Sequence, residues 1–321
     1  MTTLDLVDVS ELAQLLCVRG KDGRVGMRIG LLATMFITEP WTRSVREAVT
    51  DAAEEYIRQF GDHLRWAQGP KGPRIYRMEN GQGPFLRKWL PEHENGKGWY
   101  FGFHGGEGAD TASEFQVSAF GPDDVGRERL GHFQVYLPLT WFAEHPGATF
   151  PEFVLKLAER LRPLSGYAGV GVLEMLNDFA AQPFYVTVRQ LAERFPGLEI
   201  ENPLWHSNYL TKGIKGVNWL TILGKRWVQE IGGHDYLKMR LGDDFKLSSY
   251  DGGLMIQAGP KPQIGDVTVN RWPQHYVTLA KVLKPIQVKV HGAFHLGDPM
   301  GVEKRMDHEA SLAWLFRFDG K

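Results

Sequence analysis

The chain has 321 residues, and its composition of 43% hydrophobic, 12% aromatic and 23% charged residues predicts a folded protein with a large core, not a disordered one. A formal net charge of −1 argues against general nucleic-acid binding and gives no reason to expect an anionic membrane as partner. The single cysteine, Cys17, excludes an intramolecular disulfide and a zinc site built on several thiolates. We interpret Cys17 as a packed thiol in a reducing compartment.

The N-terminus has neither the basic region nor the long apolar region of a secretory signal. The longest apolar stretch near it, Ile29 to Ile37, is broken by Gly30 and Thr34 and is far shorter than the roughly 20 residues that span a bilayer. We therefore expect a cytoplasmic protein with no membrane partner.

The first predicted elements are a buried strand over residues 25–37 and a helix after it. Apolar residues from Val45 to Phe60 recur at helical spacing, and Gly61 ends the pattern. Residues 69–98 are rich in glycine and proline, which predicts a long irregular excursion on the surface. It is interpreted either as a functional loop or as an ordinary insertion.

Three strands are predicted next, over residues 99–103, 114–120 and 133–139. In the last two, apolar residues alternate with polar ones, which indicates an antiparallel sheet that is covered on one side. A helix over residues 151–164 follows, with Pro151 at its start.

The second half of the chain repeats this series loosely. The Asp251-Gly252 pair lies between two strand-like runs and predicts a hairpin. The predicted elements are a strand at 166–175, a helix at 184–195, a strand at 217–223, a short helix at 225–231 that ends at Gly232, strands at 245–250 and 253–258, a helix at 274–284, and an amphipathic strand at 311–318.

This order of elements predicts an α+β fold with a mixed, mainly antiparallel sheet and helices packed on one face. We expect residues 1–321 to form a single domain. Two pseudo-repeated halves, at about 20–164 and 165–321, are compatible with a diverged duplication around one sheet, although no residue-level repeat proves it.

Candidate chemical sites are few. The densest group of possible metal ligands is at the C-terminal end, but the glycines and proline around it disfavour a helix on which the ligands would converge. We therefore expect a polar loop there and no metal or cofactor. This group comprises His291, His295, Asp298, Glu303, Asp307 and His308. Because no nucleophile elbow, phosphate-binding loop or paired catalytic carboxylates were found, we expect a binding protein with no catalytic residues rather than an enzyme.

Three stretches carry a resemblance to a known family. They are residues 27–31 with the helix at 46–56, the Gly-rich run 166–171, and residues 213–223 with Trp227 and Gly232. Together they resemble the type VI secretion immunity family (TsiV-type), over roughly residues 20–260. The family implies no catalytic residues. We interpret the glycines as sites of close backbone approach, and Trp219 and Trp227 as core residues.

The resemblance implies a protein that binds and neutralises a cognate antibacterial effector, encoded beside it, in the cytoplasm of the producing cell. We expect this effector to be a nuclease. Since nuclease sites are commonly basic, the acidic pairs Asp123, Asp124 and Asp243, Asp244 are the predicted effector-binding residues. Two alternatives stay open, a hydrolase with a His/carboxylate site drawn from separate strands and a structural component of a secretion system.

Overall fold

A computed structural model describes residues 17–69, 72, 74–78, 86–125, 128–141, 150–295 and 304–321. The strands in these ranges form one eleven-stranded sheet. They are β1 (Cys17–Arg19), β2 (Val25–Ile37), β3 (Trp66–Gln68), β4 (Ile75–Arg77), β5 (Trp99–His104), β6 (Gln116–Gly121), β7 (Gly131–Leu137), β8 (Ser165–Leu173), β9 (Leu220–Gly224), β10 (Phe245–Tyr250) and β11 (Gly253–Ala258).

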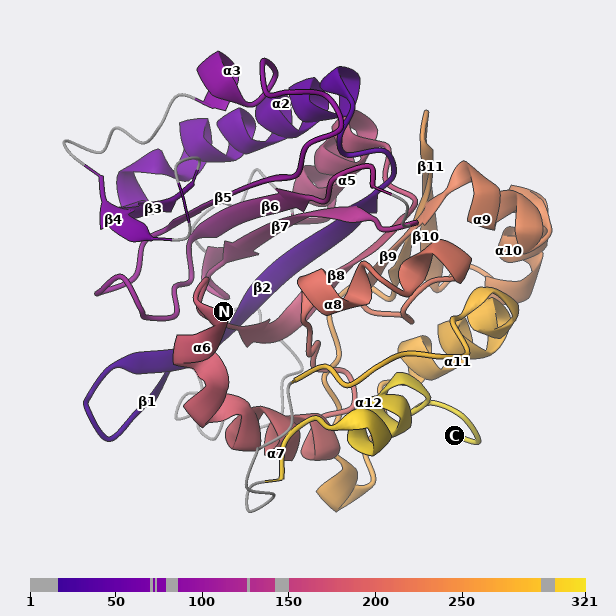
Figure 1. The fold of residues 1–321 in the computed structure, drawn as a ribbon. Helices are drawn as coiled ribbons and strands as arrows, with labels where there is room; N and C mark the ends of the chain where they lie inside the picture. Colours follow the sequence, from indigo (N-terminus) through magenta and orange to yellow (C-terminus); the bar gives the residue numbers. More distant parts are fainter. Residues whose placement is uncertain are drawn as a thin grey trace.

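The strand order is β10-β11-β9-β8-β2-β7-β6-β5-β3-β4, and β1 pairs with the start of β2 (Figure 1). All of these strand pairs are antiparallel. The long strand β2 lies in the middle, between β7 and β8, because its apolar run is long enough to be buried on both sides. This arrangement joins both halves of the sequence in one sheet.

The described helices vary from one turn to five. They are α2 (Arg43–Phe60), α3 (Leu86–Trp89), α5 (Phe150–Leu161), α6 (Asp178–Ala181), α7 (Tyr185–Arg194), α8 (Pro203–His206), α9 (Lys225–Glu230), α10 (Gly233–Leu241), α11 (Gln274–Leu283) and α12 (His308–Leu315).

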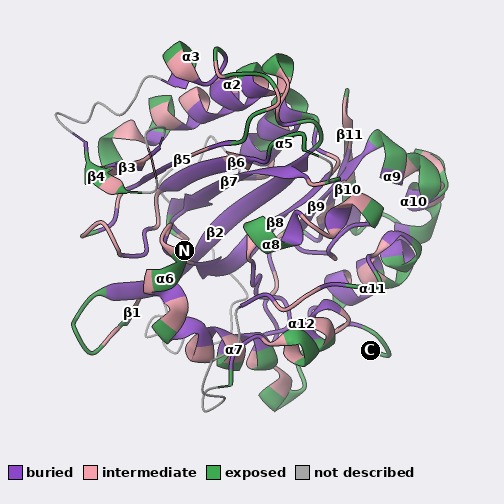
Figure 2. Ribbon diagram, in the orientation of Figure 1, coloured by how far each residue is buried: buried purple, intermediate pink, exposed green. Residues whose placement is uncertain are grey.

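Helices α2 and α5 cover one face of the sheet. Their apolar stripes pack on the alternate residues of the central strands, such as Met35 of β2 opposite Phe133 of β7. Figure 2 shows the buried side of α2 turned toward the strands and its exposed side turned away. The predicted α+β fold with a mainly antiparallel sheet is confirmed, and α2 and α5 form the helical layer on this face.

The opposite face is divided in two. Over β2 it is covered by the turn before α7, and a Cβ at Gly26 would lie 1.9 Å from the ring of Phe184 in that turn. Over β8, the Lys215 ammonium lies against the rings of both Tyr167 of that strand and Trp314 of α12. Over β5, β6 and β7 this face is hollow. The boundary between the covered and the hollow part is the segment 199–206, which positions the candidate site.

Most of the predicted elements are confirmed with small shifts in their ends, and the hairpin at 245–258 is confirmed in full. The strand predicted at 311–318 is wrong, because α12 occupies most of this range. Asp307 caps this helix by accepting a hydrogen bond from the Ala310 amide. The alternation of Trp314, Phe316 and Phe318 suggested a strand, but Trp314 and Phe318 are buried and Phe316 is half-buried at the end of the helix.

The Gly/Pro-rich region 69–98 is described in part, and it contains β4 and α3. Its end is held by Arg46 of α2, whose buried guanidinium donates hydrogen bonds to the carbonyls of Leu90, Pro91 and His93. Arg46 thus satisfies the carbonyls of the stretch after α3, which has no helix or strand to satisfy them, and holds this stretch in place.

Candidate functional site

A cavity of about 350 Å³ lies on the hollow part of the sheet. Cross-strand pairs of β6 and β7 form its floor, with Gln116 opposite Tyr136 and Ser118 opposite Gln134. Because side chains alternate between the two faces of a strand, these residues point away from the face that packs on α2 and α5. The polar positions of β6 and β7 therefore line a cavity instead of facing open solvent.

Two segments form the walls of the cavity. One is the stretch 174–178 that follows β8, and the other is 201–205, which enters the short helix α8. Pro203 stands at the first position of α8, and the Asn202 side chain accepts a hydrogen bond from the Trp205 amide at 3.4 Å. This cap fixes where α8 begins and thereby places Trp205 at the rim.

The cavity is acidic. Glu174, Asp178 and Glu201 line it, and none of its described lining residues is a lysine or an arginine. His132, also in the wall, adds no charge at neutral pH because burial lowers its pKa to about 3. The site thus presents carboxylates in a cavity with a partly apolar lining, where charges are poorly screened.

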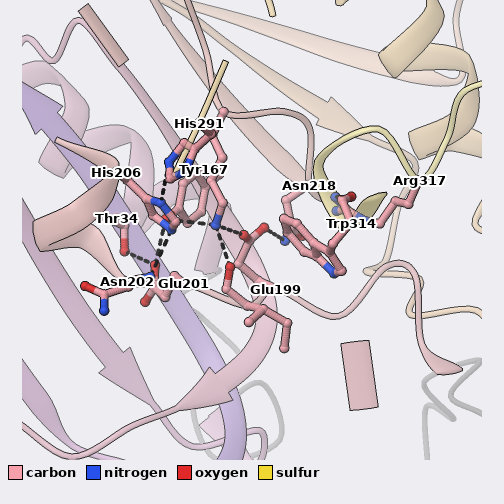
Figure 3. A network of polar contacts seen from close by, with 12 residues as sticks. Thr34, Tyr167, Glu199, Glu201, Asn202, His206, Asn218, His291, Trp314 and Arg317 are labelled. Carbon is pink, nitrogen blue, oxygen red and sulfur yellow. Dashed lines mark hydrogen bonds and ion pairs between the residues drawn. The ribbon is translucent and has the colours of Figure 1, made fainter. Parts of the chain in front are cut away.

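Glu201 is the most deeply buried of these carboxylates. Figure 3 shows it within a network of polar contacts. Its Oε2 accepts hydrogen bonds from Thr34 Oγ1 at 2.7 Å and Tyr167 Oη at 2.9 Å, and its Oε1 accepts from Gln134 Nε2 at 2.6 Å. Burial raises the pKa of Glu201 to about 7, although Lys215 and Thr34 act to lower it. Folded protein therefore holds a proton on Glu201 at pH values where an unfolded chain has released it.

Replacing Glu201 with glutamine is expected to change how stability depends on pH. The proton on Glu201 favours the folded state fully below pH 4.5, and this contribution of about 3 kcal/mol is lost as pH rises to about 7. The unfolding free energy of wild type minus that of Glu201→Gln, measured with urea from pH 5.5 to 8, should fall by about 2 kcal/mol. Glu159→Gln, at an exposed position of α5, is the control. Unfolding free energies of wild type and Glu201→Gln that change in parallel with pH would contradict the expectation.

A buried ion pair lies beside Glu201. Lys215 Nζ is 2.6 Å from Glu199 Oε1 and donates to the Ile200 carbonyl at 2.5 Å, and both side chains are only 2% exposed. The ammonium also lies 4.5 Å from the Tyr167 ring centroid and 4.9 Å from that of Trp314. Burial lowers the pKa of Lys215, and the Glu199 carboxylate opposes that shift. The pair ties the segment 199–201 to residue 215 and to α12.

The glycines of β8 allow this segment to approach. Glu199 exchanges backbone hydrogen bonds with Val170 and Val172, and a Cβ at Gly171 would lie 2.8 Å from the Glu199 Cβ. A Cβ at Gly169 would lie 2.1 Å from Asn218 Oδ1, and the Asn218 amide donates to Glu199 Oε2 at 2.7 Å. Residues from the runs 166–171 and 213–223 thus converge on Glu199.

Two histidines lock α8 to the C-terminal region. The Asn202 amide donates to His206 Nε2 at 2.9 Å, so His206 Nδ1 carries the proton and donates to His291 Nε2 at 3.0 Å. His291 Nδ1 in turn donates to the Gly292 carbonyl at 2.8 Å. Burial lowers the pKa of His206, and that of His291 to about 4, so both rings are neutral at pH 7.

Large apolar side chains are exposed around the cavity. Trp205 is 38% exposed and Leu204 43% exposed, and both line the cavity. Phe179, next to the lining residue Asp178, is 80% exposed. An apolar rim beside buried polar groups is typical of a protein–protein interface.

The four predicted effector-binding residues lie outside this cavity. Asp123 and Asp124 follow β6, and Asp243 and Asp244 precede β10 on the far edge strand. Six steps in the strand order separate β6 from β10, which corresponds to about 29 Å across the sheet at the usual strand spacing. The two pairs are therefore separate candidates and not one acidic patch.

The C-terminal histidines have different roles from one another. His291 belongs to the lock with His206, and His295 stacks on Tyr185 with ring centroids 3.7 Å apart. Asp307 caps α12 and His308 is exposed, whereas Asp298 and Glu303 lie outside the described residues. In the part of the chain that the structure describes, no three His, Cys, Asp or Glu side chains gather as a metal site would require.

Sequence reasoning missed Glu174, Glu201 and Trp205. Part of the signal was present, since the alternation in 114–120 and 133–139 identified a polar face on β6 and β7. The walls come from residues 174–178 and 201–205, far along the chain from β6 and β7, so alternation alone did not reveal that this face lines a cavity. Trp219 and Trp227 are buried in the core, as predicted.

The described helices include none whose length and apolarity together suit a bilayer crossing. Fold and site define an α+β protein with one broad antiparallel sheet, one helix-covered face and an acidic cavity with an apolar rim on the other. Residues 48–318 match the family described as TsiV, type VI immunity for VRR-NUC, and the chain belongs to this family.

A solved structure agrees with this assignment. The Pseudomonas aeruginosa T6SS protein PA0821 superimposes with a TM-score of 0.87 and is 26% identical in sequence. The match covers 98% of this chain and 91% of the Pseudomonas chain. No curated protein gives a significant match.

Proposed function

We propose that this chain binds a VRR-NUC nuclease effector of a type VI secretion system and neutralises it in the cytoplasm of the producing cell. Membership of the TsiV family carries this proposal. A nuclease has its substrate in the cytoplasm, and the neutral net charge of the chain fits a protein partner better than a nucleic acid. Neutralisation proceeds by binding, without turnover.

The hollow face of the sheet is the surface that we propose for the effector. It combines a cavity with exposed Trp205, Leu204 and Phe179, which are the apolar anchors that a protein interface needs at its centre. The acidic pairs at 123–124 and 243–244 remain candidates for the outer part of the interface, where charge mainly accelerates association.

The same cavity meets one requirement of the hydrolase alternative, because titratable groups converge in it. They do not form a nucleophile–base pair: Ser118 Oγ donates to Gln134 Oε1 at 3.3 Å, and Glu201 accepts hydrogen bonds from Thr34 and Tyr167. The arrangement favours binding over catalysis.

The deciding experiment is co-expression with the product of the adjacent effector gene. We expect rescue from toxicity and a stoichiometric complex with a catalytically inactive effector. Trp205→Ala should weaken the complex by about 30-fold, the effect of losing a central anchor. Met239→Ala removes an exposed apolar side chain from α10 and should have no effect.

Charge reversal tests the two acidic pairs separately. Lysine at 123 and 124, or at 243 and 244, should slow association if that pair belongs to the interface, and the effect should fade at high salt. Absence of both rescue and complex with the wild-type chain would overturn the proposed function.

A further inference from the structure

Three buried polar atoms in the cavity wall can each accept a hydrogen bond, and one of them, the Tyr100 hydroxyl, can also donate. Tyr100 Oη, His132 Nδ1 and Glu174 Oε1 are buried in the wall and have no hydrogen-bond partner among the residues that the structure describes. His132 is only 9% exposed, so water has little access to hydrogen-bond its ring. A buried acceptor without a donor is costly, and several in one wall indicate that a donor-rich group completes the site.

The charges of the cavity are also incompletely matched. His295 Nε2 lies 3.4 Å from Glu174 Oε1, but the two atoms lack hydrogen-bond geometry. Asp178 accepts a hydrogen bond from Tyr185, and Glu201 is held by its own donors on the floor. Glu174 is therefore the carboxylate most in need of a cation, and the described lining offers none.

Resting on the function proposed above, we propose that the cavity receives an arginine side chain of the effector, whose guanidinium binds Glu174 and donates to the neighbouring acceptors. A guanidinium carries five N–H donors in a plane, so it satisfies several acceptors at once, whereas an ammonium is a compact point charge. Its flat face also stacks on aromatic rings, which Tyr100 and Trp205 supply at the wall and the rim.

Charge complementarity identifies the source of this arginine. A nuclease carries basic side chains where it binds the phosphate backbone, and an acidic cavity with an apolar rim matches such a surface. Occupation of the cavity by a basic side chain of the effector removes that side chain from nucleic-acid binding. The immunity protein then uses one buried charge pair as the centre of the interface and the apolar rim to exclude water from it.

Binding of the inactive effector to cavity variants, measured by titration calorimetry, tests the proposal. Glu174→Gln keeps the size of the side chain and should weaken binding by about 30-fold or more, the usual effect of removing one partner of a buried charge pair. Tyr100→Phe removes one acceptor and should weaken it by about 3-fold to 10-fold. Glu159→Gln removes a charge at an exposed position of α5, on the other face of the sheet. It is the matched control and should leave the affinity unchanged.

A double-mutant cycle identifies the partner residue. Each basic residue of the effector is changed to glutamine and combined with Glu174→Gln, and one arginine should show strong coupling while the others show additive effects. Wild-type affinity in a correctly folded Glu174→Gln variant overturns the inference, as does coupling to a lysine or to no basic residue. If Trp205→Ala still weakens the complex, the proposed function survives that result, whereas failure of the wild-type chain to bind overturns both.

Discussion

Replacing Lys215 with methionine is expected to destabilise the fold by about 3 to 5 kcal/mol, the usual cost of leaving one charge of a buried pair without its partner. Methionine keeps the unbranched apolar part of the side chain and lacks only the terminal ammonium, so the main loss is the cation. Glu199 would keep the hydrogen bond from Asn218 but would lose the 2.6 Å ion pair. Urea unfolding at pH 7.5 measures the change.

Lys225 provides the matched control. Its ion pair with Asp251 is 3.4 Å long and both side chains are about two-thirds exposed, so Lys225→Met should cost less than about 1 kcal/mol. The double variant Glu199→Gln, Lys215→Met should recover part of the stability because no unpaired charge remains. A Lys215→Met variant as stable as the Lys225→Met variant would show that the buried pair does not hold the segment 199–201.

Acidification below pH 6.5 is expected to destabilise the protein before its exposed carboxylates titrate. Four buried histidines are held neutral, because burial lowers the pKa values of His104 and His291 to about 4, that of His132 to about 3, and that of His206 well below 6.5. The unfolded chain binds these protons near pH 6.5, so stability is lost as pH falls below that value. His104, His132 and His291 then each cost about 2 kcal/mol at pH 5, and His206 acts in the same direction.

The sum approaches the whole stability of a typical domain, about 5 to 15 kcal/mol. The raised pKa of Glu201 makes the fold more stable at lower pH, but this single contribution is smaller than the combined loss from the four histidines. His206 and His291 add a geometric reason, since a second proton on His206 would face the Asn202 amide, donor against donor. Loss of this contact releases α8 and the Trp205 rim.

Urea unfolding at pH 7.5, 6.5, 5.5 and 5.0 tests this expectation. In His104→Asn, the asparagine oxygen replaces Nδ1 as acceptor for the Gly106 amide and has no acid titration, so the variant should lose about 2 kcal/mol less between pH 7.5 and 5. His308→Asn, at an exposed position, should follow the wild-type curve. A wild-type stability that stays constant down to pH 5 would contradict the expected proton uptake.

The sequence by itself determined the elements whose pattern is local. Strand β2, helices α2 and α5, and the hairpin of β10 and β11 follow from periodicity and turn residues, and each forms where it was predicted. It also determined the family, because the glycine and tryptophan runs at 166–171 and 213–233 are short and specific. Those runs are now explained by packing, with Gly171 and Gly169 making room for Glu199 and Asn218.

Tertiary structure alone decided the candidate site and the last helix. The acidic pairs were chosen because their members are adjacent in sequence, but Glu174 and Glu201 come together only when the segment 199–205 folds back beside β8. Likewise, the alternation at 311–318 favoured a strand, but the structure has a helix there. Asp307 caps this helix and Trp314 packs over Lys215. A local sequence pattern determines which face of a helix or strand is apolar. Whether a charged side chain can be buried depends on partners from distant parts of the sequence, and a local pattern does not contain that information.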